Sequence, residues 1–182
     1  GIHGVVPTGT TGEFMTLTPA EYRRVFEVVN EAAAGRCHVF AGVGSTSTAE
    51  AISLAKHAEK AGSTGIMLLP PFYAAPNFAE LQVFMRSVAE SISIPVMYYN
   101  IPSSTGVTLN AEQIAQLGEI PGVNYLKDTS GDAVTMADLL ANRSDKIKAF
   151  NGWDTLTFFG LASGAEASVW GTATVIPELA VA

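Results

Sequence analysis

The sequence predicts an α/β fold, a (β/α)8 TIM barrel that lacks the first strand and helix and the closing carboxyl-terminal helices. Short apolar runs alternate with segments of helical period almost throughout the chain, and this alternation is typical of parallel β/α units. Most of the apolar runs are unbroken, as in strands that helices cover. A complete barrel has about 250 residues, whereas this chain has 182. We therefore expect one incomplete barrel domain over residues 1–182.

The apolar runs predict seven strands and the segments between them predict helices. The predicted strands are 4–7, 37–43, 64–69, 95–99, 123–127, 147–151 and 167–170. Thr18, Ser47 and Asn77 each stand three residues before a Glu, the spacing of an N-terminal capping box. The remaining helices are expected to begin at Asn110, Asp132 and Asp154 and the helices to end near Gly35, Gly62, Gly118 and Gly164.

Composition excludes several classes of protein. Hydrophobic residues make up 48% of the chain and charged residues 15%, which excludes a disordered chain. Ten Lys and Arg against seventeen Asp and Glu give a net charge of −7, and no basic run is present, so neither nucleic acid nor an anionic membrane is an expected partner. No apolar run approaches the roughly 20 residues of a membrane span, and no leader opens the chain, so a cytoplasmic protein is expected.

Neither a metal nor a dinucleotide is an expected cofactor. His3, His38 and His57 are scattered without ligand spacing. The run from Gly42 to Ser47 follows a predicted strand but lacks the third glycine of a dinucleotide fingerprint. Chemistry carried by side chains is compatible with both absences.

Lys127 is the residue most suited to carry that chemistry. It ends a predicted apolar strand, on the side where barrel enzymes place their catalytic groups. Desolvation favours a neutral amine, which attacks a ketone to form a Schiff base. From position alone, an exposed lysine or one paired with Asp128 remains an alternative. Polar residues follow other strands in the same way, at 10–11, 73, 99–100 and 151–154.

Three motifs in order give the sequence a specific resemblance. They are Gly-Thr-Thr-Gly-Glu at 9–13, Tyr-Asn-Ile-Pro-Ser-Ser-Thr-Gly at 99–106 and Leu-Lys-Asp-Thr-Ser-Gly-Asp at 126–132. Together they resemble the dihydrodipicolinate synthase/N-acetylneuraminate lyase family of Schiff-base barrel enzymes. The resemblance implies a homotetramer, a dimer of dimers, that acts on pyruvate or another 2-keto acid without metal or organic cofactor. It also favours the catalytic interpretation of Lys127.

Carried over by position, the resemblance implies a role for each motif residue. Lys127 would form the imine and Tyr99 would transfer protons beside it, while Thr10 and Tyr73 would complete a hydroxyl relay. Thr11 and the turn amides up to Gly12 would hold the keto-acid carboxylate. The further substrate-contacting positions implied are Ser104, Thr129, Gly152, Asp154, Thr155 and Val169.

The position of Ser104 separates the possible second substrates. Synthases of this family carry an Arg there that binds the acceptor carboxylate. Thr155 and Gly171 depart from the sialic acid lyase pattern, which has Glu and Ser. The sequence therefore predicts aldol cleavage or dehydration of a smaller 2-keto-3-deoxy sugar acid. Two alternatives remain: condensation of pyruvate with aspartate semialdehyde, and a non-catalytic family member or fragment. Asp154 is equally well explained as a helix N-cap.

Overall fold

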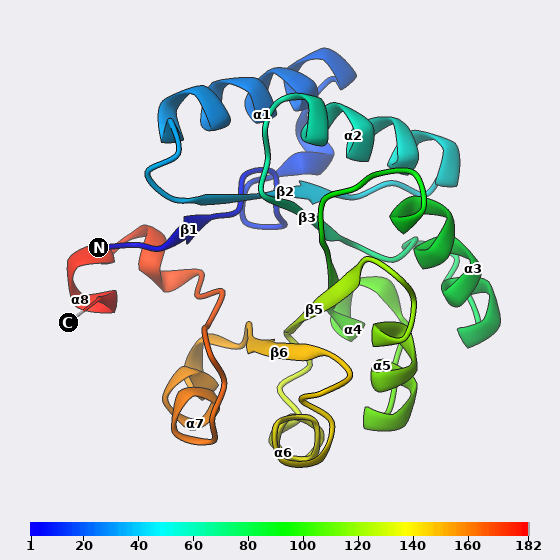
Figure 1. The fold of residues 1–182 in the computed structure, drawn as a ribbon, viewed down its shortest axis with the longest axis vertical. Coiled ribbons are helices and arrows are strands. Elements are labelled where there is room, and N and C mark those ends of the chain that lie inside the picture. The colour runs from blue at the N-terminus through cyan, green and yellow to red at the C-terminus, as the bar shows by residue number, and fades with distance from the viewer. Residues whose placement is uncertain (182) are drawn as a thin grey trace.

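The computed structural model describes residues 1–181 and contains one six-stranded sheet in the order β1-β2-β3-β4-β5-β6. All neighbouring strands are parallel. The sheet curls with its helices on the outside (Figure 1), as consecutive right-handed β/α units require. The strands are β1 (Gly4–Val5), β2 (His38–Val43), β3 (Gly65–Leu68), β4 (Val96–Asn100), β5 (Val123–Asp128) and β6 (Lys148–Asn151).

A helix follows each strand, as the sequence predicts. The main helices are α1 (Pro19–Ala33), α2 (Thr48–Lys60), α3 (Phe78–Ala89), α5 (Ala111–Gly118), α6 (Ala133–Asn142) and α7 (Thr157–Ala162). Shorter helical segments are α4 (Pro102–Thr105), α8 (Pro177–Ala180) and the 3-10 turns η1 (Phe14–Thr16), η2 (Asp154–Leu156) and η3 (Thr172–Thr174). None of the helices within residues 1–181 has the length and apolarity that a membrane span requires.

The predicted helix starts are confirmed except at Asp154. Thr18, Asn77 and Asn110 form complete capping boxes, while the side chains of Ser47 and Asp132 accept backbone N–H groups of the first turn. Asp154 instead lies inside η2. Its carboxylate accepts the backbone N–H groups of residues 171 and 172, so it is used in holding a distant loop.

Three of the predicted helix ends lie at a left-handed glycine and the fourth does not. Gly35, Gly62 and Gly164 follow helices with φ of 73°, 93° and 100°. Gly118 is still helical. A Cβ there would lie 2.3 Å from the Lys146 carbonyl oxygen, so close packing against the chain before β6 explains this glycine.

The predicted seventh strand at 167–170 is wrong as a strand. It is reduced to a single parallel bridge between Asn151 and Ser168, so residues 1–181 form an open, curled sheet and not a closed ring. The carboxyl-terminal segment with η3 and α8 returns beside the amino terminus (Figure 1). A side chain at Gly1 would meet Val181 at 2.9 Å. The predicted incomplete barrel thus agrees with the structure in its parallel strand order.

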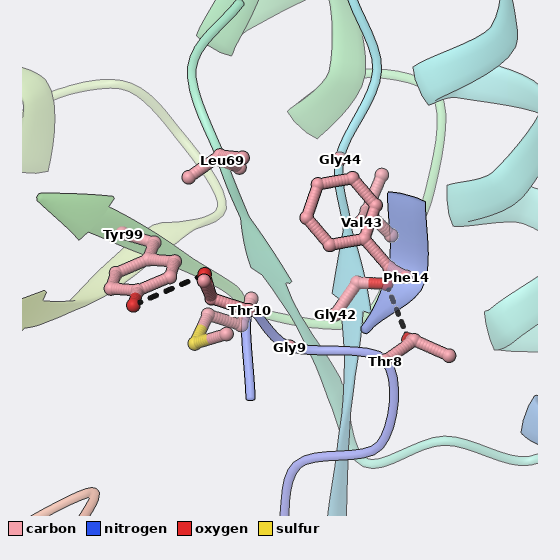
Figure 2. Close-up of a pocket in the computed structure, with 10 residues that line it drawn as sticks. Thr8, Gly9, Thr10, Phe14, Gly42, Val43, Gly44, Leu69 and Tyr99 are labelled. Atoms are coloured by element: carbon pink, nitrogen blue, oxygen red, sulfur yellow. Dashed lines mark hydrogen bonds between the residues drawn. The ribbon is translucent and has the colours of Figure 1, made fainter. Parts of the chain in front are cut away.

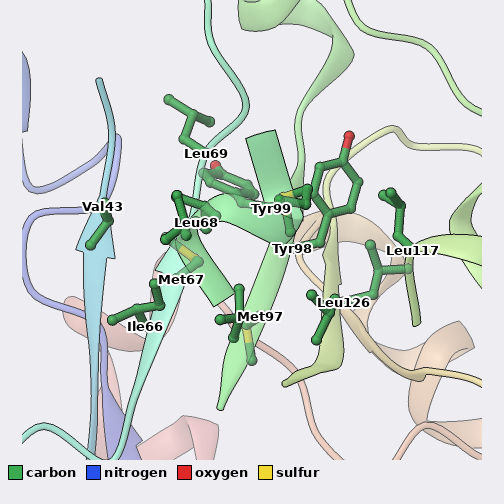
Figure 3. Packing of buried hydrophobic residues seen from close by; sticks show 14 of the residues in the cluster. Val43, Ile66, Met67, Leu68, Leu69, Met97, Tyr98, Tyr99, Leu117 and Leu126 are labelled. Carbon is green, nitrogen blue, oxygen red and sulfur yellow. The ribbon is translucent and has the colours of Figure 1, made fainter. Parts of the chain in front are cut away.

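Two apolar layers hold this arrangement together. Between the sheet and the helices, large side chains such as Leu68, Tyr98 and Leu126 are fully buried (Figure 3). Inside the curl, the ring of Tyr125 contacts those of Phe40 and Phe150, with centroids 5.8 and 5.6 Å away. These rings fill the space below the carboxyl ends of the strands, where the polar residues lie.

Tyr22 of α1 ties β2 to its covering helix and predicts a loss of stability in alkali. Its hydroxyl donates to the Gly42 carbonyl and accepts the Gly44 N–H. Burial raises the pKa of Tyr22 from 10.0 to about 12. The unfolded phenol therefore loses its proton first, and the free energy of unfolding should fall between pH 10 and 12, by up to about 2.7 kcal/mol for a shift of two units.

Denaturant unfolding of the wild type and Tyr22→Phe, at pH 7 and from pH 9 to 12, measures this effect. The pH 7 difference gives the cost of the lost hydrogen bonds, and the variant should lose less stability between pH 10 and 12. Some alkaline loss remains, because burial also raises the pKa of Tyr98. Equal alkaline slopes in the two proteins would contradict the prediction.

Candidate functional site

A cavity of about 290 Å³ opens at the carboxyl ends of the strands. It contains eight of the residues that the sequence predicts: Thr10, Thr11, Tyr99, Lys127, Thr129, Gly152, Asp154 and Val169. Ile101, Trp153 and Gly171 also line it and were not predicted as site residues. Ile101 and Trp153 lie inside the segments 99–106 and 151–154 that the sequence already indicates, and Gly171 lies two residues after Val169.

Lys127 and Tyr99 lie beside each other in the lining of this cavity. They are register partners on β5 and β4, so their side chains project from the same face of the sheet. The Lys127 Nζ lies 4.2 Å from the centroid of the buried Tyr99 ring, within the range of a cation–π contact. This contact places a phenol hydroxyl and an amine in one pocket.

Pairing of Lys127 with Asp128 is not what the structure contains. Successive strand residues point to opposite faces, and the Asp128 carboxylate is bonded behind the sheet to Asn100 and Ser130. Within residues 1–181, no carboxylate lies within salt-bridge distance of Lys127. Lys127 is therefore available to a ligand.

Gly152 provides the space through which the Lys127 side chain passes. A Cβ at position 152 would lie 2.8 Å from both Cγ and Cε of Lys127 and 2.6 Å from Thr129 Oγ1. The Gly152 N–H donates to the Asp128 carbonyl, which fixes its backbone beside β5. Only a residue without a side chain fits this approach without a shift.

The loop after β1 brings Thr10 over the Tyr99 hydroxyl. Thr10 Oγ1 lies 3.4 Å from Tyr99 Oη (Figure 2), a long bond of the kind that tightens when a ligand arrives. The loop is fastened behind this point, where Thr8 Oγ1 donates to the Gly42 carbonyl at 2.8 Å. A Cβ at Gly42 would lie 2.4 Å from the backbone carbonyl oxygen of Thr8. Glycine at position 42 therefore allows the loop to lie this close to β2.

A buried polar pair lies behind the reactive residues. Asn100 Nδ2 donates to Asp128 Oδ1 at 2.7 Å, and Ser130 donates its hydroxyl to Oδ2 at 2.9 Å. Burial raises the pKa of Asp128 despite these hydrogen bonds. The nearby Tyr98 hydroxyl and Asn100 Oδ1 are buried without a hydrogen-bond partner in the described part of the chain.

Asp154 lines the cavity and binds the carboxyl-terminal segment. Its two carboxylate oxygens accept the N–H groups of Gly171 and Thr172, at 3.1 and 3.0 Å, and the Thr172 hydroxyl donates to one of them. These oxygens are thus already occupied by donors from this chain. A substrate hydroxyl would have to compete for them.

Four predicted site residues do not line the cavity. Tyr73 is fully exposed, with φ of 77°. Ser104 and Thr155 are exposed on α4 and η2. Gly12 lies in the turn below Thr10, where a Cβ would meet the Thr8 nitrogen at 3.0 Å, so its part in the fold is the tight turn itself.

No cluster of three or more His, Cys, Asp or Glu able to hold a metal ion occurs within residues 1–181. The groups that line the cavity are one amine, one phenol, hydroxyls, an indole and one carboxylate. Such a set can form and hydrolyse an imine and can move protons.

Substitution of Gly152 by Ala should displace Lys127. The added methyl would overlap Lys127 Cε, so we expect the Nζ to leave the Tyr99 ring and the unfolding free energy to fall by about 1–3 kcal/mol. A crystal structure and denaturant unfolding of Gly152→Ala measure both. Gly9→Ala is the control, because its nearest contact would be an ordinary 3.5 Å. An unmoved Lys127 would show that the site relaxes in another way.

Comparison with known proteins assigns the family. Residues 1–182 match the Dihydrodipicolinate synthetase family over their whole length. A 4-hydroxy-tetrahydrodipicolinate synthase of Methanopyrus kandleri is 40% identical over 185 aligned positions, which cover 100% of this chain and 61% of that protein. One of Geotalea uraniireducens is 37% identical, with 98% and 61% covered. The chain thus spans about 61% of the length of these relatives.

Solved structures agree with the sequence match. The dihydrodipicolinate synthase of Aquifex aeolicus superposes with a TM-score of 0.91 at 31% identity, over 97% of this chain and 61% of that one. The chloride-inhibited enzyme of Acinetobacter baumannii, complexed with pyruvate, has a TM-score of 0.93 at 32% identity, with the same coverage. The chain therefore belongs to the dihydrodipicolinate synthetase family, whose members are lyases of the class I aldolase type.

Proposed function

We propose that the protein is a pyruvate lyase that works through a Schiff base on Lys127. The observation that carries the proposal is the contact of Lys127 Nζ with the Tyr99 ring, at 4.2 Å, inside the cavity at the carboxyl ends of the strands. A relative of 32% identity is described as complexed with pyruvate. Among the described residues, no other lysine lines this cavity.

The reaction at Lys127 needs two proton transfers. The neutral amine adds to the keto carbon of pyruvate and gives a carbinolamine. The first transfer carries a proton from the nitrogen to the developing alkoxide and completes the carbinolamine. This intermediate then takes a second proton on its hydroxyl and loses water to form the protonated imine. The Tyr99 hydroxyl, with Thr10 at 3.4 Å, is placed to give and take those protons. Thr11 lines the same cavity, and with the N–H groups of the adjoining turn it would receive the pyruvate carboxylate.

For the second substrate, we propose condensation of the imine-derived enamine with aspartate semialdehyde. The support is that relatives of 35–40% identity are named 4-hydroxy-tetrahydrodipicolinate synthase. The contacts of Asp154 weaken the competing sugar-acid reaction, because its carboxylate oxygens already accept N–H groups from residues 171 and 172. Asp154 is one of the implied substrate-contacting positions, and a carboxylate already occupied by its own chain is less available to the hydroxyls of a sugar acid.

Cleavage or dehydration of a 2-keto-3-deoxy sugar acid is the second candidate. One observation favours it: within residues 1–181, Lys127 is the only cation that lines the cavity, and Ser104 lies exposed outside it. A second carboxylate would then lack the charge-assisted pair that an Arg provides.

We also propose that the protein works as a homo-oligomer, with a tetramer as the expected form. Tyr73 is fully exposed and lies outside its own chain's cavity. It could join the proton relay only if a second copy of the chain placed it there. One solved neighbour of 25% identity is described as a monomeric dihydrodipicolinate synthase variant.

Reduction with borohydride in the presence of pyruvate tests the Schiff base. Hydride adds to the imine carbon and leaves a stable secondary amine, which peptide mass mapping should locate on Lys127. Lys127→Ala should give no adduct and retain its fold, while Lys60→Ala, an exposed control on α2, should be labelled normally. An adduct on another lysine would refute the role of Lys127, and no adduct at all would favour a non-catalytic chain.

Comparison of kcat/KM for the two second substrates decides between the two candidates. We expect condensation with aspartate semialdehyde to exceed turnover of a 2-keto-3-deoxy sugar acid by tenfold or more, which corresponds to about 1.4 kcal/mol in transition-state binding. The opposite ratio would establish the sugar-acid reaction and assign selectivity to the absence of an Arg in the 100–106 loop.

A further inference from the structure

A row of buried polar residues lies directly behind the row that carries the reactive groups. Asn100, Asp128 and Asn151 pair laterally across β4, β5 and β6, and each follows the inward-facing residue of its strand. All three are at most 3% exposed. Burial of a polar side chain lowers the stability of the fold unless the side chain is hydrogen-bonded. Packing alone therefore does not explain this row.

The pair of Asn100 with Asp128 joins the two strands on which the site depends. Its 2.7 Å hydrogen bond crosses from β4 to β5, one residue beyond the register pair of Tyr99 with Lys127. The backbone bond from the Thr129 N–H to the Asn100 carbonyl, at 2.8 Å, lies at the same end. Hydrogen bonds on the helix side of the sheet thus join the ends of β4 and β5 next to the positions where Tyr99 and Lys127 project into the cavity.

Asp128 also fixes the loop that leads away from Lys127. Its oxygens accept the Ser130 N–H and hydroxyl, while its carbonyl accepts the Gly152 N–H at 2.7 Å. Gly152 in turn leaves room for the Lys127 side chain. A substitution of Asp128 would therefore shift the Lys127 side chain by moving the backbone around it, although Asp128 itself touches no ligand.

We propose that Asn100 and Asp128 are positioning residues that hold the Lys127 amine against the Tyr99 phenol through their hydrogen bond across β4 and β5. The proposal rests on the proposed function, because it assigns the pair to imine formation at Lys127. Neither residue lines the cavity, so neither is expected to touch substrate.

The chemistry of the pair allows a rescue experiment. Asn100→Asp places two carboxylates against each other and should separate the strand ends at pH 8. The swap Asn100→Asp with Asp128→Asn restores one carboxylate opposite one amide. Asp128→Asn alone leaves two amides, which can still bond to each other and to Ser130. An exposed pair on α6, in which Asn142 donates to Asp138 at 2.8 Å, provides the matched control Asn142→Asp.

Two readouts on each variant separate this proposal from the proposed function. The first is the rate of borohydride trapping of pyruvate on Lys127. The second needs no pyruvate: it is the acetylation of Lys127 by a water-soluble succinimidyl acetate, measured by mass spectrometry relative to the exposed Lys60. If the wild type traps no pyruvate on Lys127, the proposed function fails, while the acetylation ratio still tests the positioning.

We expect Asn100→Asp to lower the trapping rate at least tenfold and to raise the acetylation ratio at least threefold. The swap should return both to within threefold of wild type, and Asn142→Asp should change neither. The proposal is overturned if Asn100→Asp lowers the thermal midpoint but leaves the acetylation ratio at the wild-type value, which indicates a structural role only. It is also overturned if the swap restores neither readout.

Discussion

The lateral pairing of β4 with β5 is the constraint on which the site depends. It sets an amine and a phenol side by side, because parallel strands lie about 4.8 Å apart and register partners face the same side. Tyr99 and Lys127 are far apart in the sequence, and only their pairing across β4 and β5 brings the amine next to the phenol. The same register sets Asn100 beside Asp128 on the reverse face. Covering helices then exclude water from that face.

Local patterns predicted most of the fold. Strand and helix order follow from apolar runs and from caps such as Thr18 and Asn77, because these signals act within a few residues. The prediction of a seventh strand was wrong because a strand also depends on pairing with distant parts of the chain. Only Ser168 bridges to Asn151, since the neighbour that would extend the ladder on its other side is not supplied by residues 1–181.

The candidate site was predictable where a residue follows a strand directly. Lys127, Tyr99 and Thr10 meet because the carboxyl ends of parallel strands converge. Tyr73 could not be placed by the same rule, because its loop is long enough to carry it outward to solvent. Asp154 illustrates a second limit. Its partners are residues 171 and 172, and nothing near it in sequence indicates that contact.

Trp153 adds an optical property to this architecture. Trp153 is 41% exposed and lines the cavity, and its indole packs over Gly131, next to Gly152, which accommodates Lys127. Emission from an indole shifts with the water around it, and a ligand that fills the cavity would displace water from this ring. The molecule thus carries a natural fluorophore at the mouth of its site, where occupancy and light emission are coupled without any added dye.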